Sequence, residues 1–283
     1  MTDVTGSRIV YDDQADVFEA RAGVPDAAAA EVAAAVQDLR ASVPDGLLVE
    51  IGAGTGVIGR WLARLPGRYL GLDSSAAMLR VFRPRLPAAP DAALLVADAD
   101  APWPVRDGAA GVVFGSRVLH LLRPDHAAAQ LRRVAHRGGA LLLCGRIVHS
   151  PDSPRTLARR RLRELLAERG LRPRPTGGRP DRLLALAVEQ GAEPLPVRVA
   201  AAWPETVTTG QVIDWWRGKT SLGGVNPSRE VAEAVLAALT RWARDTQPAV
   251  PVTTTTRYLL EGVRLPAVAS GAARPRGALT SKE

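Results

Sequence analysis

Short apolar segments alternate with amphipathic segments through the first half of this 283-residue chain. Glycine or polar residues bound each apolar segment, and the segments cover residues 47–51, 69–72, 93–97, 110–116 and 140–143. Between them, apolar residues recur at helical spacing over residues 25–43, 57–65, 75–82 and 126–134. Strands that are apolar throughout are typical of a sheet with both faces covered. The alternation therefore predicts an α/β fold with a doubly wound, mostly parallel, Rossmann-like sheet.

The rhythm of the pattern changes after residue 150. Amphipathic spacing and capping residues predict helices over residues 154–170, 182–190, 209–217 and 227–245. Runs of β-branched and small residues predict strands over residues 197–202 and 252–263. We expect the last strand to join the sheet as an antiparallel hairpin strand.

A glycine-rich turn gives the sharpest chemical signal. The sequence EIGAGTG at residues 50–56 directly follows the first predicted strand and precedes a helix. Glycines there let the chain turn tightly and let a ligand approach the main chain, and helix N-terminal amides favour an anionic group. Asp73 ends the next predicted strand, nineteen residues after Gly54, where an acidic side chain binds ribose hydroxyls.

Gly54, Gly56 and Gly59 also match the dinucleotide fingerprint G-x-G-x-x-G. The predicted strand ends at Ile51, however, so the first glycine of the turn is Gly52. The register therefore favours the pattern E-x-G-x-G-x-G, with an NAD-dependent oxidoreductase as an alternative.

Taken together, the motifs of the first half resemble the class I S-adenosylmethionine-dependent methyltransferases. The motifs that carry the resemblance, in chain order, are EIGAGTG at 50–56, Asp73, ADA at 97–99, GVVFGSRVLHLL at 111–122 and GGALLL at 138–143. The family often has an aspartate before the two valines of the fourth strand, where this chain has Gly111. The resemblance implies S-adenosylmethionine as the cofactor.

The resemblance also implies a role for each matching residue. Gly52, Gly54 and Gly56 would pass beneath the cofactor, within a turn that also includes Glu50 and Ala53. Asp73 would bind the ribose, and the other cofactor contacts would be Ser74 and Met78 near the adenine, Asp98 and Ala99 at its amino group, and Ser116 near the methionine moiety. The segment YDDQADVFEAR, with Tyr11 and Arg21 at its ends, is similar to a lid that covers the cofactor in relatives.

Candidate acceptor-side residues follow the fourth and fifth strands. His120 and His149 are placed to act as a general base for a hydroxyl nucleophile, and the alternative for each is a packed histidine. Trp215 and Trp216 are candidates for an aromatic acceptor pocket, and the alternative is that they pack an added helix. The histidines show no metal-ligand spacing, so we expect no metal.

These assignments imply a domain layout. We expect an N-terminal lid and first helix over residues 1–46 and a cofactor-binding core over residues 47–203. A helical lid insertion would cover the substrate over residues 204–246, the last strand would complete the sheet over residues 247–266, and residues 267–283 would form a flexible tail.

Charge and composition limit the choice of acceptor. The net charge is +8, and it is concentrated between residues 155 and 182, where ten arginines stand against three acidic residues. This segment has no aromatic residue, which disfavours nucleic acid as a partner, and we interpret its arginines as a solvated helix face. The chain has one cysteine, Cys144, and no apolar run long enough to span a membrane, so we expect a cytoplasmic protein.

The sequence therefore predicts methyl transfer to a small organic molecule at O, N or C, with secondary-metabolite tailoring as one setting. The alternatives are a methyltransferase fold that catalyses another reaction such as cyclisation, an RNA methyltransferase, and the oxidoreductase already named. The sequence leaves both a monomer and a homodimer open.

Overall fold

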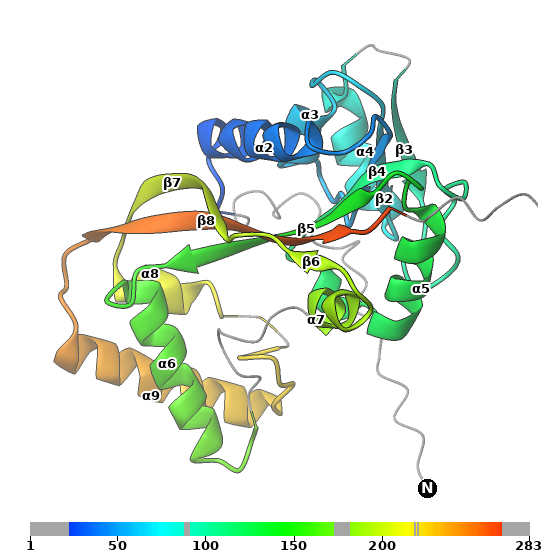
Figure 1. Ribbon diagram of the computed structural model, residues 1–283. Helices are drawn as coiled ribbons and strands as arrows, with labels where there is room; N and C mark the ends of the chain where they lie inside the picture. The colour runs from blue at the N-terminus through cyan, green and yellow to red at the C-terminus, as the bar shows by residue number, and fades with distance from the viewer. Residues whose placement is uncertain (1–22, 88–90, 173–181, 218, 220, 268–283) are drawn as a thin grey trace, which may run out of the picture.

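The computed structural model describes residues 23–87, 91–172, 182–217, 219 and 221–267. Its centre is one eight-stranded sheet with the order β3-β2-β1-β4-β5-β8-β6, and β7 also pairs with β8 (Figure 1). The strands are β1 Leu47–Ile51, β2 Tyr69–Asp73, β3 Ala92–Val96, β4 Ala110–Ser116, β5 Ala140–His149, β6 Glu193–Pro194, β7 Arg198–Val207 and β8 Val252–Leu265.

The first five strands are parallel. β1 lies between β2 and β4, β2 pairs with β3, and β4 pairs with β5, all in the same direction. The chain therefore reverses its strand order beside β1, and the carboxyl ends of β1 and β4 meet at the point where α/β folds bind ligands. This arrangement confirms the predicted fold class.

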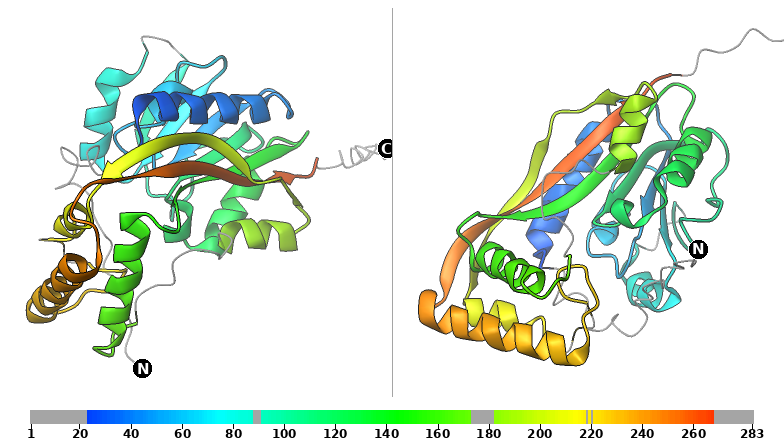
Figure 2. Two further views of the ribbon diagram at one scale, coloured as in Figure 1. Left: turned by 90° about the vertical axis from the view of Figure 1, so that its left-hand side faces the viewer. Right: turned by 90° about the horizontal axis from the view of Figure 1, so that it is seen from below.

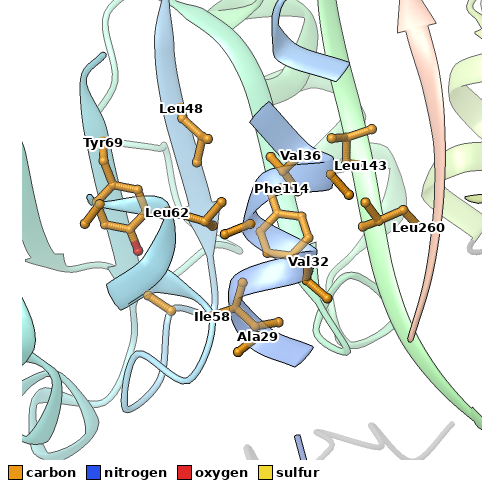
Figure 3. Packing of buried hydrophobic residues seen from close by; sticks show 14 of the residues in the cluster. Ala29, Val32, Val36, Leu48, Ile58, Leu62, Tyr69, Phe114, Leu143 and Leu260 are labelled. Carbon is orange, nitrogen blue, oxygen red and sulfur yellow. The ribbon is translucent and has the colours of Figure 1, made fainter. Parts of the chain in front are cut away.

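Helices cover both faces of the parallel sheet. α2 (Asp26–Arg40), α3 (Gly59–Leu62) and α4 (Ala76–Phe82) contribute to one core, and α5 (Pro124–Val134) and α7 (Arg182–Glu189) to the other. On the first face, Val32 and Val36 of α2 pack against Phe114 of β4 and Leu143 of β5 (Figure 3). All four side chains are fully buried. This double cover explains why the strands are apolar throughout.

The antiparallel strands are longer than the sequence predicts. β5 continues to His149 because β8 pairs with it over its whole length, from Leu265 opposite Ala140 to Thr256 opposite His149. β7 likewise continues to Val207, past Pro204. Proline is tolerated at that position because, among the described strands, β7 pairs with β8 alone and its other edge has no strand partner.

Three helices beyond this long hairpin pack on one another: α6 (Pro154–Ala167), α8 (Thr209–Asp214) and α9 (Arg229–Thr246). They have a hydrophobic core of their own, with Leu162, Ile213 and Leu239 at its centre, and they lie together below the ends of the strands (Figure 2). We call α6, α8 and α9 the lid helices.

The lid helices correct two of the expected boundaries. The sequence placed α6 in the core over residues 47–203, but α6 packs on α8 and α9 because its apolar face meets theirs. The insertion predicted from residue 204 begins later, since residues 204–207 still pair with β8. Apart from residue 267, the predicted tail lies outside the described residues. In the described part of the chain, no helix is long and apolar enough to cross a membrane.

Gly145 of β5 sets how closely β8 crosses it. A Cβ atom at this position would lie 1.9 Å from the Tyr258 hydroxyl oxygen and 2.6 Å from its ring. We expect Gly145→Ala to lower the free energy of unfolding by roughly 1–3 kcal/mol, since the added methyl overpacks the site. In a Tyr258→Leu background the same substitution should cost less. Urea unfolding of the four chains measures this, and an equal cost in both backgrounds would contradict it.

Candidate functional site

The Asp73 carboxylate joins two loops at the carboxyl edge of the sheet. One oxygen accepts a hydrogen bond from the Gly54 amide at 2.8 Å, and the other accepts one from the Ser75 amide at 2.8 Å. The Gly52 and Ala53 amides both donate to the Leu72 carbonyl, at 2.8 and 3.0 Å. The glycine turn after β1 is therefore fixed onto the end of β2.

The three glycines of the turn have positive φ angles of 68°, 55° and 81°, but their surroundings differ. A Cβ at Gly52 would lie 2.7 Å from the Val118 side chain, and one at Gly56 would lie 2.2 Å from the Phe82 ring. A Cβ at Gly54 would meet its nearest heavy atom at 4.0 Å. Gly52 and Gly56 thus serve packing, and among the described residues only Gly54 of the three has free space beside its Cα atom.

Glu50 does not face this ligand side. It is 2% exposed, it accepts a hydrogen bond from the Tyr69 hydroxyl, and its carboxylate lies beneath Gly59 of α3. Burial raises the pKa of Glu50 to about 8; the bond from Tyr69 opposes this rise and the charge of Asp73 adds to it. The expectation that Glu50 contacts the cofactor is therefore wrong. Its side chain is buried below the turn, against Tyr69. The first position of the motif lies on the strand, where side chains point into the core.

The expected adenine-binding residues lie on two neighbouring loops and on α4, which begins directly after the first of these loops. Ser74 is exposed, Met78 is 3% exposed, and the Ser75 hydroxyl caps α4 by accepting a hydrogen bond from the Met78 amide. On the next loop, Asp98 accepts a hydrogen bond from the Asp100 amide at 2.9 Å. These loops follow β2 and β3, which are adjacent in the sheet.

Trp103 is a positioning residue that the sequence analysis missed. Its indole nitrogen donates to the Ala99 carbonyl at 2.9 Å, and the side chain is 3% exposed. Trp103 therefore fixes the loop that contains Asp98 and Ala99. A tryptophan between two prolines, Pro102 and Pro104, was the available signal.

Ser116, expected near the methionine moiety, is the last residue of β4 and is hydrogen-bonded to Tyr258 of β8. Its hydroxyl accepts a hydrogen bond from Tyr258 at 2.6 Å, and Tyr258 is fully buried. Burial raises the pKa of Tyr258, so its hydroxyl stays protonated. The next residue, Arg117, has a φ of 58°, which is uncommon for a residue with a side chain. Its amide donates to the Gly145 carbonyl at 2.9 Å, so pairing with β5 maintains the turn.

The two candidate bases lie in different surroundings. His120 is exposed on the short 3-10 helix Leu119–Leu121, directly after β4. His149 ends β5 and its side chain is 16% exposed. Ser116 pairs with Gly145, four residues before His149, so His149 lies about 13 Å further along the strand direction than Ser116.

His149 belongs to a polar cluster between the sheet and the lid helices, which we call the junction cluster. It consists of His149, Thr256, Glu205, Arg155 and Trp215. The His149 Nδ1 atom lies 3.0 Å from the Thr256 hydroxyl and 3.5 Å from a Glu205 carboxylate oxygen. Arg155 contacts both Glu205 oxygens, at 2.7 and 2.6 Å, and stacks 3.6 Å above the Trp215 ring.

The junction cluster corrects two expectations. Arg155 was assigned to a solvated helix face, but it is 8% exposed because Glu205 and Trp215 enclose it. Trp216 was a candidate for acceptor binding, but it packs against the core of the lid helices. Trp215 is 38% exposed and remains a candidate.

Glu205 is the charged centre of the cluster. Burial alone would raise its pKa, but hydrogen bonds from His149 and Arg155, together with the Arg155 charge, lower the pKa of Glu205 to about 2. The carboxylate is therefore ionised at neutral pH. Tyr11 and Arg21, the expected cofactor lid, lie outside the described residues. No group of acidic, histidine and cysteine side chains that could hold a metal is found in the described ranges.

The sequence of residues 49–143 matches a family model described as a methyltransferase domain. The match spans β1 to β5 and includes the glycine turn, Asp73 and Asp98, so it confirms the resemblance seen in the sequence. No curated protein sequence matches the chain.

Two solved structures have the same fold as this chain. A proposed type II methyltransferase from Anaeromyxobacter dehalogenans is 22% identical, with a TM-score of 0.51 over 83% of this chain and 97% of that chain. A proposed methyltransferase from Bacillus halodurans C-125 is 14% identical, with a TM-score of 0.52 over 83% of this chain and 98% of that chain.

The buried Glu50–Tyr69 pair predicts an unusual pH dependence of stability. The pKa of Glu50 rises from 4.5 to about 8 on folding, so the folded protein keeps a proton that the unfolded chain releases. Stability should therefore fall as pH rises between these values. Glu50→Gln retains an acceptor for Tyr69 and cannot ionise, so above pH 8 it should be more stable than the parent by roughly 2–5 kcal/mol.

Thermal or urea unfolding at pH 5 and pH 9 measures this difference. Glu31→Gln, on the exposed side of α2, is the matched control. Equal stabilities of the Glu50→Gln chain and the parent at pH 9 would contradict a buried, protonated Glu50.

Proposed function

We propose that this protein transfers a methyl group from S-adenosylmethionine to a small organic acceptor, at O, N or C. The observation that carries the proposal is the open backbone at Gly54 beside the Asp73 carboxylate, at the carboxyl ends of β1 and β2. A carboxylate next to an accessible glycine turn fits a ligand with ribose hydroxyls, as S-adenosylmethionine has.

The described residues would contact this cofactor as follows. Asp73 would accept the ribose hydroxyls, Gly54 would allow close approach of the backbone, and Asp98 would accept the adenine amino group. Met78 and Ser74 would border the adenine, and Ser116 would lie near the methionine moiety, held by Tyr258. When bound, the cofactor supplies an activated methyl group on its sulfonium.

The chain's contribution to the reaction would be binding, orientation and exclusion of water. The lid helices lie beyond the carboxyl ends of β4 and β5, and Trp215 offers a partly exposed aromatic surface for the acceptor. His120 and His149 are the two candidate bases. A hydroxyl oxygen must lose its proton as it is methylated, whereas a nitrogen reacts through its lone pair. The identity of the base therefore depends on the class of acceptor.

Asp73→Ala should weaken S-adenosylmethionine binding by about 1–3 kcal/mol, because charge-assisted hydrogen bonds to the ribose are lost. Isothermal titration calorimetry with S-adenosylmethionine, and with NAD as the comparison ligand, measures this. Asp152→Ala, an exposed aspartate at the start of the lid helices, is the control and should bind normally. Unchanged affinity of a folded Asp73→Ala chain, or tighter binding of NAD by the parent, would contradict the proposal.

Gly54→Val should abolish cofactor binding and leave the protein folded, because the side chain would enter the space where the ligand approaches the backbone. Gly170→Val is the matched control, since Gly170 also has a positive φ, 74°, and has no heavy atom within 4 Å of a built Cβ. Both variants carry similar backbone strain, of about 1–2 kcal/mol. Calorimetry and unfolding curves separate strain from occlusion. Normal binding by Gly54→Val would show that the ligand lies elsewhere.

A further inference from the structure

The junction cluster gathers five elements around one imidazole ring. His149 ends β5, Thr256 lies opposite it on β8, and Glu205 lies on β7. Arg155 opens α6, and Trp215 follows α8. All of these residues except Trp215 are largely buried. Such a network contributes more than packing when it fixes the state of a reactive group.

The hydrogen bonds of the cluster fix the tautomer of His149. A carboxylate can only accept hydrogen bonds, so the Thr256 hydroxyl, 3.5 Å from Glu205, points its proton towards the carboxylate. The Thr256 oxygen then accepts from Nδ1 of His149 at 3.0 Å, and the Glu205 oxygen at 3.5 Å favours the same donor. The proton of the neutral ring therefore resides on Nδ1, and Nε2 carries the lone pair.

Arg155 keeps this arrangement in place. Its two contacts hold the Glu205 carboxylate in one orientation, and its stacking on Trp215 connects that orientation to the lid helices. Among the described residues, Nδ1 is the only ring atom of His149 with a hydrogen-bonding partner in the protein. The cluster thus supplies a candidate base, His149, and two residues that orient it, Thr256 and Glu205. Arg155 in turn orients the Glu205 carboxylate.

We propose that His149 is the general base of the transfer, through Nε2, and that the acceptor therefore presents a hydroxyl group. Thr256 and Glu205 are the positioning residues of this base. The inference rests on the proposed function, which it deepens by naming the acceptor class.

The step balances without any further reactant. As the acceptor oxygen forms its bond to the methyl carbon, the carbon–sulfur bond breaks and the sulfonium becomes a neutral thioether. The hydroxyl proton passes to Nε2, and the imidazolium later releases it to water. An amine reacts through its lone pair and loses its proton afterwards, so a positioned base matters most for a hydroxyl.

The position of His149 suits the acceptor rather than the cofactor. It lies about 13 Å further along the strand direction than Ser116, the residue expected near the methionine moiety. The acceptor oxygen must contact both Nε2 and the methyl group, so the proposal places the acceptor hydroxyl between His149 and the methionine end of the cofactor. His120, by contrast, is exposed beside β4.

Histidine ring nitrogen spectra of the ligand-free protein test the positioning. With the ring neutral, the His149 signals should show the Nδ1–H tautomer. Thr256→Val and Glu205→Gln should each reduce its population relative to the other tautomer, by about tenfold for a lost hydrogen bond. Thr256→Ser should restore it. A neutral His149 with its proton on Nε2 in the parent protein would overturn the proposal, whether or not the protein binds S-adenosylmethionine.

Reaction with diethyl pyrocarbonate tests whether Nε2 is presented to a ligand. Mass spectrometry should locate modification at His149 faster than at His136, whose Nδ1 accepts the Gly138 amide. Thr256→Val should slow the reaction at His149 and Thr256→Ser should not. A packed, purely structural His149 would remain unmodified, and that result would overturn the proposal that His149 is the general base.

Protection against this reagent tests the acceptor class. With S-adenosylhomocysteine bound, we expect catechol to slow modification of His149 at least several-fold more than 1,2-dimethoxybenzene, which has the same ring without hydroxyl groups, at the same concentration. Equal protection by the two compounds, or none by either, would contradict the hydroxyl assignment. Loss of S-adenosylhomocysteine binding itself would instead refute the proposed function, so the two failures are distinguishable.

Discussion

The candidate site depends on one carboxylate. Asp73 accepts the Gly54 amide with one oxygen and the Ser75 amide with the other, and so sets the distance between the turn after β1 and the loop after β2. Two hydrogen bonds to a charged acceptor are strong enough to hold a turn of glycines that has little preference of its own. The open backbone at Gly54, the cap of α4 by Ser75 and the position of Met78 all follow from this arrangement.

Three hydrophobic cores hold the rest of the described structure around that edge of the sheet. Two hydrophobic cores hold the parallel strands, and the long hairpin of β5, β7 and β8 carries the chain to a third core among the lid helices. The lid helices pack mainly on one another. Buried polar contacts, above all those between Arg155 and Glu205, therefore fix how they meet the sheet. The proposed base, His149, lies within this set of contacts.

Local patterns predicted the fold well, because the parallel strands are short apolar runs and the glycine turn is contiguous. The same patterns did not predict contacts that depend on the register between strands far apart in the sequence. The Tyr258–Ser116 bond and the meeting of His149 with Glu205 depend on how β8 pairs with β5 and β7, which single-sequence periodicity does not encode. The prediction for Glu50 failed for a related reason. Its place in the motif suggested contact with the cofactor, but its place on β1 turns the side chain into the core. Arg155 looked solvated because its partners come from distant segments.

The most direct test of the account is a map of backbone amide chemical shifts as S-adenosylhomocysteine is added to the isotope-labelled protein. The arrangement at Asp73 predicts that the largest changes occur at the Gly54 and Ser75 amides, with a second group at Asp98 and Ala99. It predicts little change at Gly170, which has a similar backbone conformation far from the turn in sequence. Saturable changes that leave Gly54 and Ser75 unmoved, or no changes at all, would contradict the account.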